Sequence, residues 1–369
     1  MFESINNWIG GLSDPMQFAL FSGVKIIGVF SVLMFCVAYA VWVERKVAAA
    51  IQDRIGPNRA GIFGLLQPAC DGIKAFLKED FTPAHVRKAY FWIAPAVAMI
   101  PALLTVAVIP FGSQIGEQKM VIADLNVGIL YTFGIVSLGV YGIVLAGYAA
   151  NSKYPFIGGI RSSAQMVSYE LAMGMSVIPI FLWVGNLNLS DLVLSQTGYV
   201  SWLPEALGGL RLPNWFVFQS PMLALSFFIF MVAAFAETNR TPFDLPEAEQ
   251  ELAGGYNIEY SSIKFALFFM GEYAAMITAS AMMVTLFFGG WTLPWFGLDQ
   301  PATSIAGGFL HIGIFFAKVV AFVFMIIWVR WMWPRFRYDQ LMDLGWRTFI
   351  PLALANIVVT ALWLWWRLA

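Results

Sequence analysis

Eight apolar runs, each long enough to cross a lipid bilayer as a helix, dominate this sequence. A spanning helix needs about 20 apolar residues for a hydrocarbon core about 30 Å thick. In lipid such a helix satisfies its own backbone hydrogen bonds. We therefore predict an all-α polytopic membrane protein whose single integral domain covers residues 1–369. Its eight transmembrane helices are expected at 18–43, 90–110, 125–149, 162–185, 216–236, 263–288, 308–329 and 348–366.

The composition excludes a soluble enzyme. Only 12% of the residues are charged and 60% are hydrophobic, whereas soluble domains carry about 25% charged residues. So few charges cannot cover the surface of a water-soluble body of 369 residues. The net charge of −1 gives no indication of a nucleic-acid partner.

The residues that commonly hold redox centres are scarce. Cys36 and Cys70 are the only cysteines, and His85 and His311 are the only histidines. Two cysteines cannot supply the four thiolates of a typical iron–sulfur cluster or of a four-cysteine zinc site. We therefore expect that this chain alone binds no redox cofactor.

The basic residues predict the orientation of the chain. Sixteen of the 21 lysines and arginines fall in the loops after the first, third, fifth and seventh runs. The positive-inside rule places these loops in the cytoplasm, or in the matrix of an organelle, with both termini on the opposite side. The chain's length favours a bacterial inner membrane with periplasmic termini. Residues 1–17 contain no Lys or Arg, so we expect the first run to be retained rather than cleaved as a signal peptide.

The loop at 44–89 carries eight basic residues and a second kind of helix. A sharp turn is expected at Gly56-Pro57. After it, apolar residues recur at helical spacing while charged residues occupy the other faces, which predicts an amphipathic helix lying in the membrane interface. A basic cluster that only contacts anionic headgroups would not explain the interleaved Glu44, Asp53 and Asp71. The apolar positions are Ile62, Leu65, Leu66, Ala69, Ile73, Phe76 and Leu77.

The loop at 237–262 is strongly acidic. It holds six carboxylates around one central cation, Arg240. Asp244 and Glu247 have the spacing of a capping box, and Pro246 suits a first helical turn. A solvated helix would be the ordinary interpretation. The carboxylates, however, continue into the predicted spans.

Glu170 and Glu272 fall within the fourth and sixth runs, about 12 Å from the cytoplasmic end at ~1.5 Å per residue. Burying an acid there costs ~2.5–3.5 kcal/mol, and such residues often line proton or ion paths. Alternatively, each of these two residues could be a neutral glutamic acid that only forms a hydrogen bond to a neighbouring helix. Because Glu237 could link Glu170 and Glu272 to the acidic loop, we favour a proton relay through these carboxylates. We expect Lys318 to be their counter-charge.

Several segments, in order along most of the chain, carry a resemblance to a known family. The chain resembles the membrane subunits of respiratory complex I, the proton-pumping NADH–quinone oxidoreductase, that include the bacterial H subunit and mitochondrial NADH dehydrogenase subunit one. The segments are VERK at 43–46, RIGPN at 54–58, GLLQPACDGIKAFLKE at 64–79, NSKYPF at 151–156, RSSAQMVSYE at 161–170, AETNRTPFDLPEAEQELAGGYNIEY at 236–260, GEY at 271–273 and PRFRYDQLM at 334–342.

The resemblance implies eight spans, an amphipathic helix after the first, and a narrow quinone tunnel. Quinone would be reduced at the far end of the tunnel, inside peripheral-arm subunits and beside their terminal iron–sulfur cluster. FMN and the iron–sulfur clusters would therefore belong to partner subunits, and the other partners would be small membrane-arm subunits, quinone and lipid. The implied tunnel charges are Glu44, Arg45, Arg54, Asp71, Arg161, Arg240, Asp244, Glu247 and Glu249. The implied proton path comprises Glu170, Glu237, Glu251, Glu259 and Glu272.

Two alternatives belong to other classes. A related membrane anchor could serve an energy-converting hydrogenase or a dehydrogenase with another electron donor. A stand-alone ion transporter would use Glu170, Glu272 and Lys318 as a midplane site, although the sequence shows no inverted repeat of the kind found in many transporters.

Overall fold

The computed structural model describes residues 14–116, 118–200, 212–245 and 254–368. Within these residues, seven helical segments are long and apolar enough to cross a membrane, and an eighth apolar helix is shorter. The prediction of an all-α polytopic membrane protein is confirmed. The long segments are α2 (Asp14–Ile51), α4 (Lys88–Leu104) with the 3₁₀ turn η2 (Thr105–Val108), α5 (Gly128–Ala149), α6 (Lys153–Val184), α11 (Ser262–Phe287), α12 (Ile305–Met332) and the C-terminal run α13 (Tyr338–Asp343), η6 (Leu344–Phe349) and α14 (Ile350–Leu368).

The fifth predicted span is divided into two helices. The short α8 (Phe216–Gln219) ends before Ser220, and α9 (Pro221–Glu237) begins at a proline. Pro221 has no N–H to continue the preceding helix but suits a first helical position. The Ser220 hydroxyl accepts a hydrogen bond from the Leu223 N–H at 3.2 Å and caps α9. With 17 residues, α9 is about 25 Å long, which makes it shorter than any of the seven long segments.

Two helices extend further than the apolar runs indicate. α2 continues to Ile51, and α6 begins at Lys153 rather than near residue 162. Glu44 and Arg45 therefore lie on the last turns of α2, and Arg161 lies within α6. Rigid helices, rather than loops, position these three charges.

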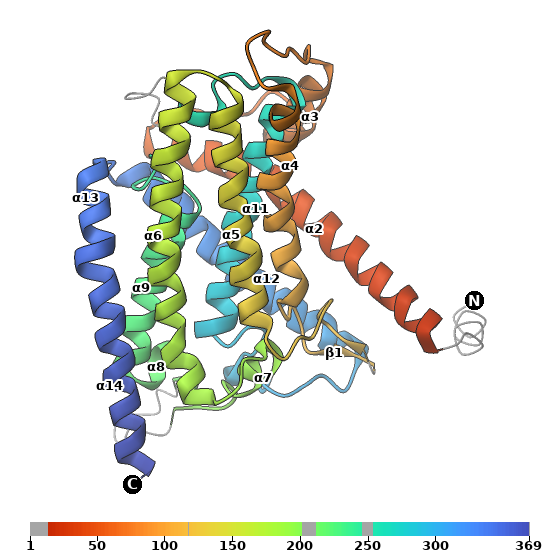
Figure 1. The fold of residues 1–369 in the computed structure, drawn as a ribbon. Coiled ribbons are helices and arrows are strands. Elements are labelled where there is room, and N and C mark those ends of the chain that lie inside the picture. The colour runs from red at the N-terminus through yellow and green to blue at the C-terminus, as the bar shows by residue number, and fades with distance from the viewer. Residues whose placement is uncertain (1–13, 117, 201–211, 246–253, 369) are drawn as a thin grey trace, which may run out of the picture.

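The helices form one bundle from which α2 leans outward (Figure 1). α4 packs on α5, α5 on α6, and α6 on both α9 and α14. α11 contacts α2, α4, α9 and α12, and so lies at the centre of the bundle. α2 begins and α14 ends at the end opposite α3 (Figure 1). An even number of crossings accounts for this arrangement.

The amphipathic segment consists of a 3₁₀ turn, η1 (Ile62–Gly64), followed by α3 (Gln67–Leu77). It is not one continuous helix because Gly64 has φ +77° and a side-chain carbon there would lie 2.4 Å from the Pro57 carbonyl oxygen. The apolar residues Ile73, Phe76 and Leu77 of α3 are 59%, 76% and 82% exposed. An exposed apolar face on a short helix is typical of a helix that lies in a membrane interface.

Glycines bring α4 and α5 into close contact. A side-chain carbon at Gly142 would lie 2.5 Å from the Ala98 backbone nitrogen, whereas one at Gly139 would have no atom within 4 Å. Small residues let helices approach closely in lipid. Gly142 therefore marks a packing contact, and Gly139 on the same helix does not.

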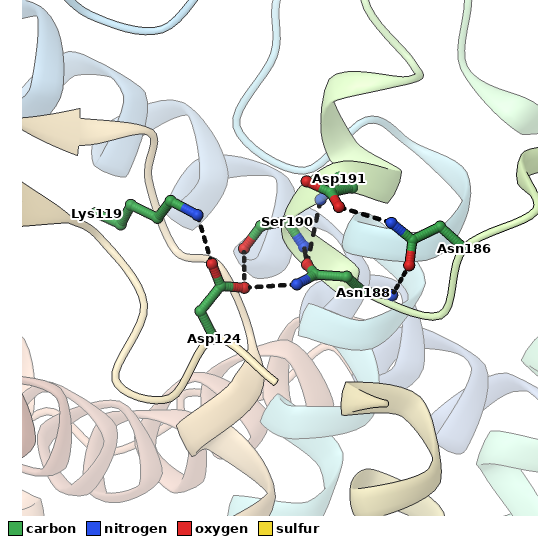
Figure 2. A network of polar contacts seen from close by, with 6 residues as sticks. All are labelled: Lys119, Asp124, Asn186, Asn188, Ser190 and Asp191. Atoms are coloured by element: carbon green, nitrogen blue, oxygen red, sulfur yellow. Dashed lines mark hydrogen bonds and ion pairs between the residues drawn. The ribbon is translucent and has the colours of Figure 1, made fainter. Parts of the chain in front are cut away.

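A polar network ties the connections together at the end opposite α3 (Figure 2). There a short hairpin, β1 (Gln114–Ile115) and β2 (Gln118–Lys119), lies near α7 (Leu189–Leu194). Asp124 accepts hydrogen bonds from Lys119 at 2.6 Å, Asn188 at 2.9 Å and Ser190 at 3.1 Å. Burial alone would raise the pKa of Asp124, but these three donors lower it below its ordinary value.

Candidate functional site

A buried group of charges lies where the ends of α2, α9 and α12 meet α11. Glu44, 5% exposed on α2, forms ion pairs with Arg240 at 3.5 Å and with Arg330 of α12. The Tyr273 hydroxyl of α11 donates a hydrogen bond to the same carboxylate at 2.6 Å. Glu44, Arg240, Tyr273 and Arg330 are called the Glu44 cluster below. Since one carboxylate has three partners, the cost of burying its charge is offset.

Arg240 is almost completely enclosed, at 3% exposed. Its guanidinium lies 4.1 Å from the centre of the Tyr273 ring, within the range of a cation–π contact. Burial alone would lower the pKa of Arg240, but Tyr273, Glu44 and Glu272 together raise it. Its Nε and Nη2 atoms have no hydrogen-bond partner among the described residues. A permanently charged group with two donors unpaired within the described ranges can bind a polar ligand.

The backbone after α9 directs Arg240 inward. Thr238 and Asn239 form a turn in which Asn239 has a left-handed φ of 52°, a conformation that asparagine tolerates better than most residues. Gln165 of α6 donates hydrogen bonds of 2.7 Å to two carbonyls, those of Ala236 and Phe243. One amide side chain thus joins both sides of the loop, which fixes its shape from the interior of the bundle.

A second buried ion pair lies at the end of the same loop. Asp244, 6% exposed, accepts a hydrogen bond from Arg335 at 2.7 Å. Burial raises the pKa of Asp244. The positive charges of Arg335, Arg330 and Arg240 lower it, but not enough to cancel the effect of burial. Asp244 Oδ1 and Arg335 Nη1 have no partner among the described residues. This pair therefore also has polar atoms left for a ligand or a partner.

Two carboxylates line a cavity of about 110 Å³ between α4, α5, α6, α9 and α11. Glu272 accepts a hydrogen bond from the Tyr256 hydroxyl at 3.2 Å. Neither carboxylate oxygen of Glu237 has a hydrogen-bond partner among the described residues. Glu170 on α6 is close enough to Glu237 for their charges to interact. The structure therefore brings together three of the five residues predicted for the proton path.

The other predicted tunnel charges that the structure describes lie outside the Glu44 cluster. Arg45 pairs with Asp71 at 2.7 Å and so connects α2 to α3. Arg54 is exposed and donates to Gln52 rather than to any member of the Glu44 cluster. The Arg161 guanidinium lies 5.5 Å from the centre of the Tyr338 ring. Among the predicted tunnel charges that the structure describes, Glu44 pairs with Arg240 and Arg45 pairs with Asp71, in two separate places.

The remaining predicted residues have different placements. Glu259 lies 3.6 Å from the His85 imidazole, and neither residue lines the cavity of Glu237 and Glu272. Glu247, Glu249 and Glu251 lie outside the described residues, so their positions stay predictions.

The prediction that Lys318 neutralises the buried glutamates is wrong. Its ammonium group donates hydrogen bonds of 2.7, 2.9 and 2.7 Å to the carbonyls of Phe288, Gly290 and Thr292. These carbonyls follow the end of α11, where a helix leaves acceptors unsatisfied and favours a positive charge. Lys318 therefore caps α11.

Sequence reasoning missed three residues of the site. Tyr273 lies in the quoted GEY segment, but only its neighbour Glu272 was expected to act. Arg330 and Arg335 were interpreted as topology signals near the end of the seventh span. The sequence does show basic residues at the end of the seventh span. It does not show whether such a residue contacts lipid headgroups or forms an ion pair inside the protein.

Metal-ligating groups do not gather in the described ranges. Cys36 is half-buried and Cys70 exposed, and both are free thiols. No three His, Cys, Asp or Glu side chains in the part of the chain that the structure describes are arranged to hold a metal ion.

Comparison with known proteins identifies close relatives over nearly the whole chain. Residues 24–361 match the family model described as NADH dehydrogenase. A Cytophaga hutchinsonii protein, named as an H subunit of NADH-quinone oxidoreductase, is 46% identical over 94% of this chain and 97% of its own length. The H subunit of Rhodospirillum rubrum is 48% identical over 89% of each chain. A Koribacter versatilis protein of the same name is 45% identical, covering 94% of this chain and 97% of its own.

Proposed function

Because the chain belongs to the family of NADH-quinone oxidoreductase H subunits, which are membrane subunits of complex I, we propose that it walls the quinone tunnel of that enzyme. We further propose that it couples quinone reduction to proton translocation. The family assignment favours this function over a hydrogenase anchor or a stand-alone transporter. Electrons would arrive from FMN and iron–sulfur clusters held by partner subunits.

The observation that carries the proposal is the closeness of two differently charged regions. The Glu44 cluster includes Arg240, whose guanidinium has two donors without a partner among the described residues. Glu272 adjoins Tyr273 on α11, is close enough to Arg240 for their charges to interact, and lines the cavity that Glu237 also lines. A change of charge on a ligand bound beside Arg240 would therefore be felt by these carboxylates through a medium of low dielectric.

The chemistry of quinone suits an electrostatic link between the Glu44 cluster and these carboxylates. Quinone becomes quinol by taking up two electrons and two protons, so the charge in the tunnel changes as the reaction proceeds. We propose that Arg240 and Arg335 bind and orient polar groups in the tunnel while the loop 238–245 shifts in response. Glu237, Glu272 and Glu170 would then redistribute protons toward neighbouring membrane subunits.

The arrangement of charges also supports the proposed partners and location. The end of the bundle with α3 carries most of the basic loops and would face the cytoplasm and the peripheral-arm subunits. The exposed apolar face of α3 would lie in the interface beside the tunnel opening, in contact with lipid. The protein would be a multi-pass subunit of the bacterial inner membrane with both termini on the periplasmic side, beside small membrane-arm subunits.

The proposed role in the quinone tunnel can be tested by comparing quinone with a hydrophilic artificial electron acceptor. In purified complex, Asp71→Trp should lower NADH–quinone reductase activity, whereas reduction of a hydrophilic artificial acceptor by the peripheral arm should stay unchanged. Lys78→Trp, at the exposed C-terminal end of α3, is the matched control and should leave both activities unchanged. Equal loss of both activities in Asp71→Trp would contradict a role in the quinone path and indicate failed assembly.

A further inference from the structure

A second, larger cavity of about 560 Å³ lies on the flank of the bundle, between α2, α11, α12 and the β1–β2 hairpin. Most of its lining on α2 comes from the first half of that helix, so it lies toward the end opposite α3 and away from the Glu44 cluster. Ligand sites usually measure about 300–1,000 Å³. This flank cavity is therefore large enough for a substantial ligand.

The walls of the flank cavity are apolar and open to the side. The lining residues Val24, Val32 and Phe309 are 64%, 54% and 63% exposed. These side chains belong to helices long and apolar enough to span a membrane. An occupant must therefore be apolar over most of its length and able to enter from the bilayer.

Lys25 gives the flank cavity its single charge. It is the one charged residue among the described residues that line the cavity, and it has no hydrogen-bond or ion-pair partner within the described ranges. It follows Ala19, the start of the apolar part of α2, by six residues, or ~9 Å along the helix. A lysine at that depth extends its ammonium group toward the headgroup region. The cavity thus combines a long apolar space with one cation at headgroup level.

We propose that the flank cavity binds an anionic phospholipid. One acyl chain fills the space between α2 and α12, and the phosphate pairs with the Lys25 ammonium as a point-charge contact. The occupant keeps the outward-leaning α2 attached to the bundle at the end where α2 makes few contacts of its own. A quinone tail would fill the apolar space equally well but would leave the ammonium without a partner.

Native mass spectrometry of delipidated complex, titrated with dioleoylphosphatidylglycerol or dioleoylphosphatidylcholine, tests the proposal. Lys25→Gln should weaken retention of one phosphatidylglycerol about five-fold, because a basic residue near anionic lipid contributes ~1 kcal/mol. Phosphatidylcholine retention should not change. Lys25→Arg should restore wild-type retention, which separates loss of charge from failed folding.

Two glycines on α2 provide matched variants for the acyl chain. Gly28 lines the flank cavity and Gly23 does not, and a side-chain carbon at either position would have no atom within 4 Å. Gly28→Leu should remove the same phosphatidylglycerol, and Gly23→Leu should leave it bound. Unchanged retention in both Lys25→Gln and Gly28→Leu would overturn the proposal. So would equal loss of both lipids in Lys25→Gln, or a quinone in place of the phospholipid.

Discussion

Tyr273 donates a hydrogen bond of 2.6 Å to Oε2 of Glu44, and its ring stacks on the guanidinium of Arg240. One side chain therefore holds both an acid from α2 and a base from the loop after α9. Its neighbour along α11, Glu272, lines the cavity that Glu237 also lines. Consecutive residues of one helix thus connect the two charged regions of the site.

Tyr273→Phe should lower quinone reductase activity about ten-fold, because a hydrogen bond to a charged group contributes about 1.5–3 kcal/mol. The ring that stacks on Arg240 would remain, so the fold and the artificial-acceptor activity should not change. Both activities are measured on the purified complex. Tyr131→Phe, which removes a hydroxyl that contacts the Leu104 carbonyl at 3.5 Å, is the control. Wild-type quinone reduction in Tyr273→Phe would remove the hydroxyl from the mechanism.

The helices were predictable from the sequence because each is a long apolar run, and lipid allows few other structures for such a run. Their ends were less predictable. α2 continues through Glu44, Arg45 and Lys46, and hydrophobicity alone stops at such charges. Helical hydrogen bonding does not stop there, because polar residues also propagate a helix that leaves the membrane.

Two members of the Glu44 cluster were predicted, but their pairing and their partners Tyr273 and Arg330 were not. Glu44 and Arg240 were expected on one tunnel because of the family resemblance, while their ion pair joins residues 196 positions apart. No periodic pattern encodes such a contact. Lys318 shows the opposite case, since a buried lysine and buried glutamates suggest pairing, yet backbone carbonyls at the end of α11 satisfy the lysine. Both glutamates and the free carbonyls at a helix end can pair with a buried lysine. Which of them lies close to the lysine depends on how the helices pack.

Exchanging the charges of Arg45 and Asp71 tests whether their ion pair positions α3. Asp71→Arg alone should impair quinone reduction, because it places two cations together and releases α3 from α2. The double variant Arg45→Asp with Asp71→Arg should recover much of the activity. Thermal stability should change little in either variant, since exposed pairs contribute at most ~1 kcal/mol. Failure of the double variant to exceed the single variant in quinone reduction would contradict this role.

The network around Asp124 should stabilise the protein in a pH-dependent way. Its pKa is lowered in the folded state, so its contribution is present above the ordinary value of 3.8 and is lost as the pH falls through the folded-state pKa. Asp124→Asn should therefore lower the melting temperature at pH 7, and the difference from wild type should shrink as the pH falls below about 4. Asp299→Asn, which removes a carboxylate without a side-chain partner among the described residues, is the control. A difference that grows in acid would contradict the assignment.

Gly142→Ala should destabilise the protein by about 1–3 kcal/mol, the usual cost of overpacking. The added carbon would meet the Ala98 backbone, which cannot move without shifting α4. Gly139→Ala on the same helix has open space and should be neutral or stabilising by up to about 1 kcal/mol. Thermal unfolding of the detergent-solubilised complex measures both variants. Equal melting temperatures for the two would show that α4 and α5 are not in close contact there.

If carboxylates beside the Glu44 cluster carry protons driven by quinone reduction, Glu237→Gln should impair proton translocation more than quinone reduction. Complex reconstituted in liposomes is followed for NADH oxidation by quinone and for proton movement in the same sample. The exposed Glu79→Gln is the control and should match wild type. We predict that Glu237→Gln moves fewer protons per quinone reduced than either. A wild-type ratio of protons to quinone in Glu237→Gln would contradict the account.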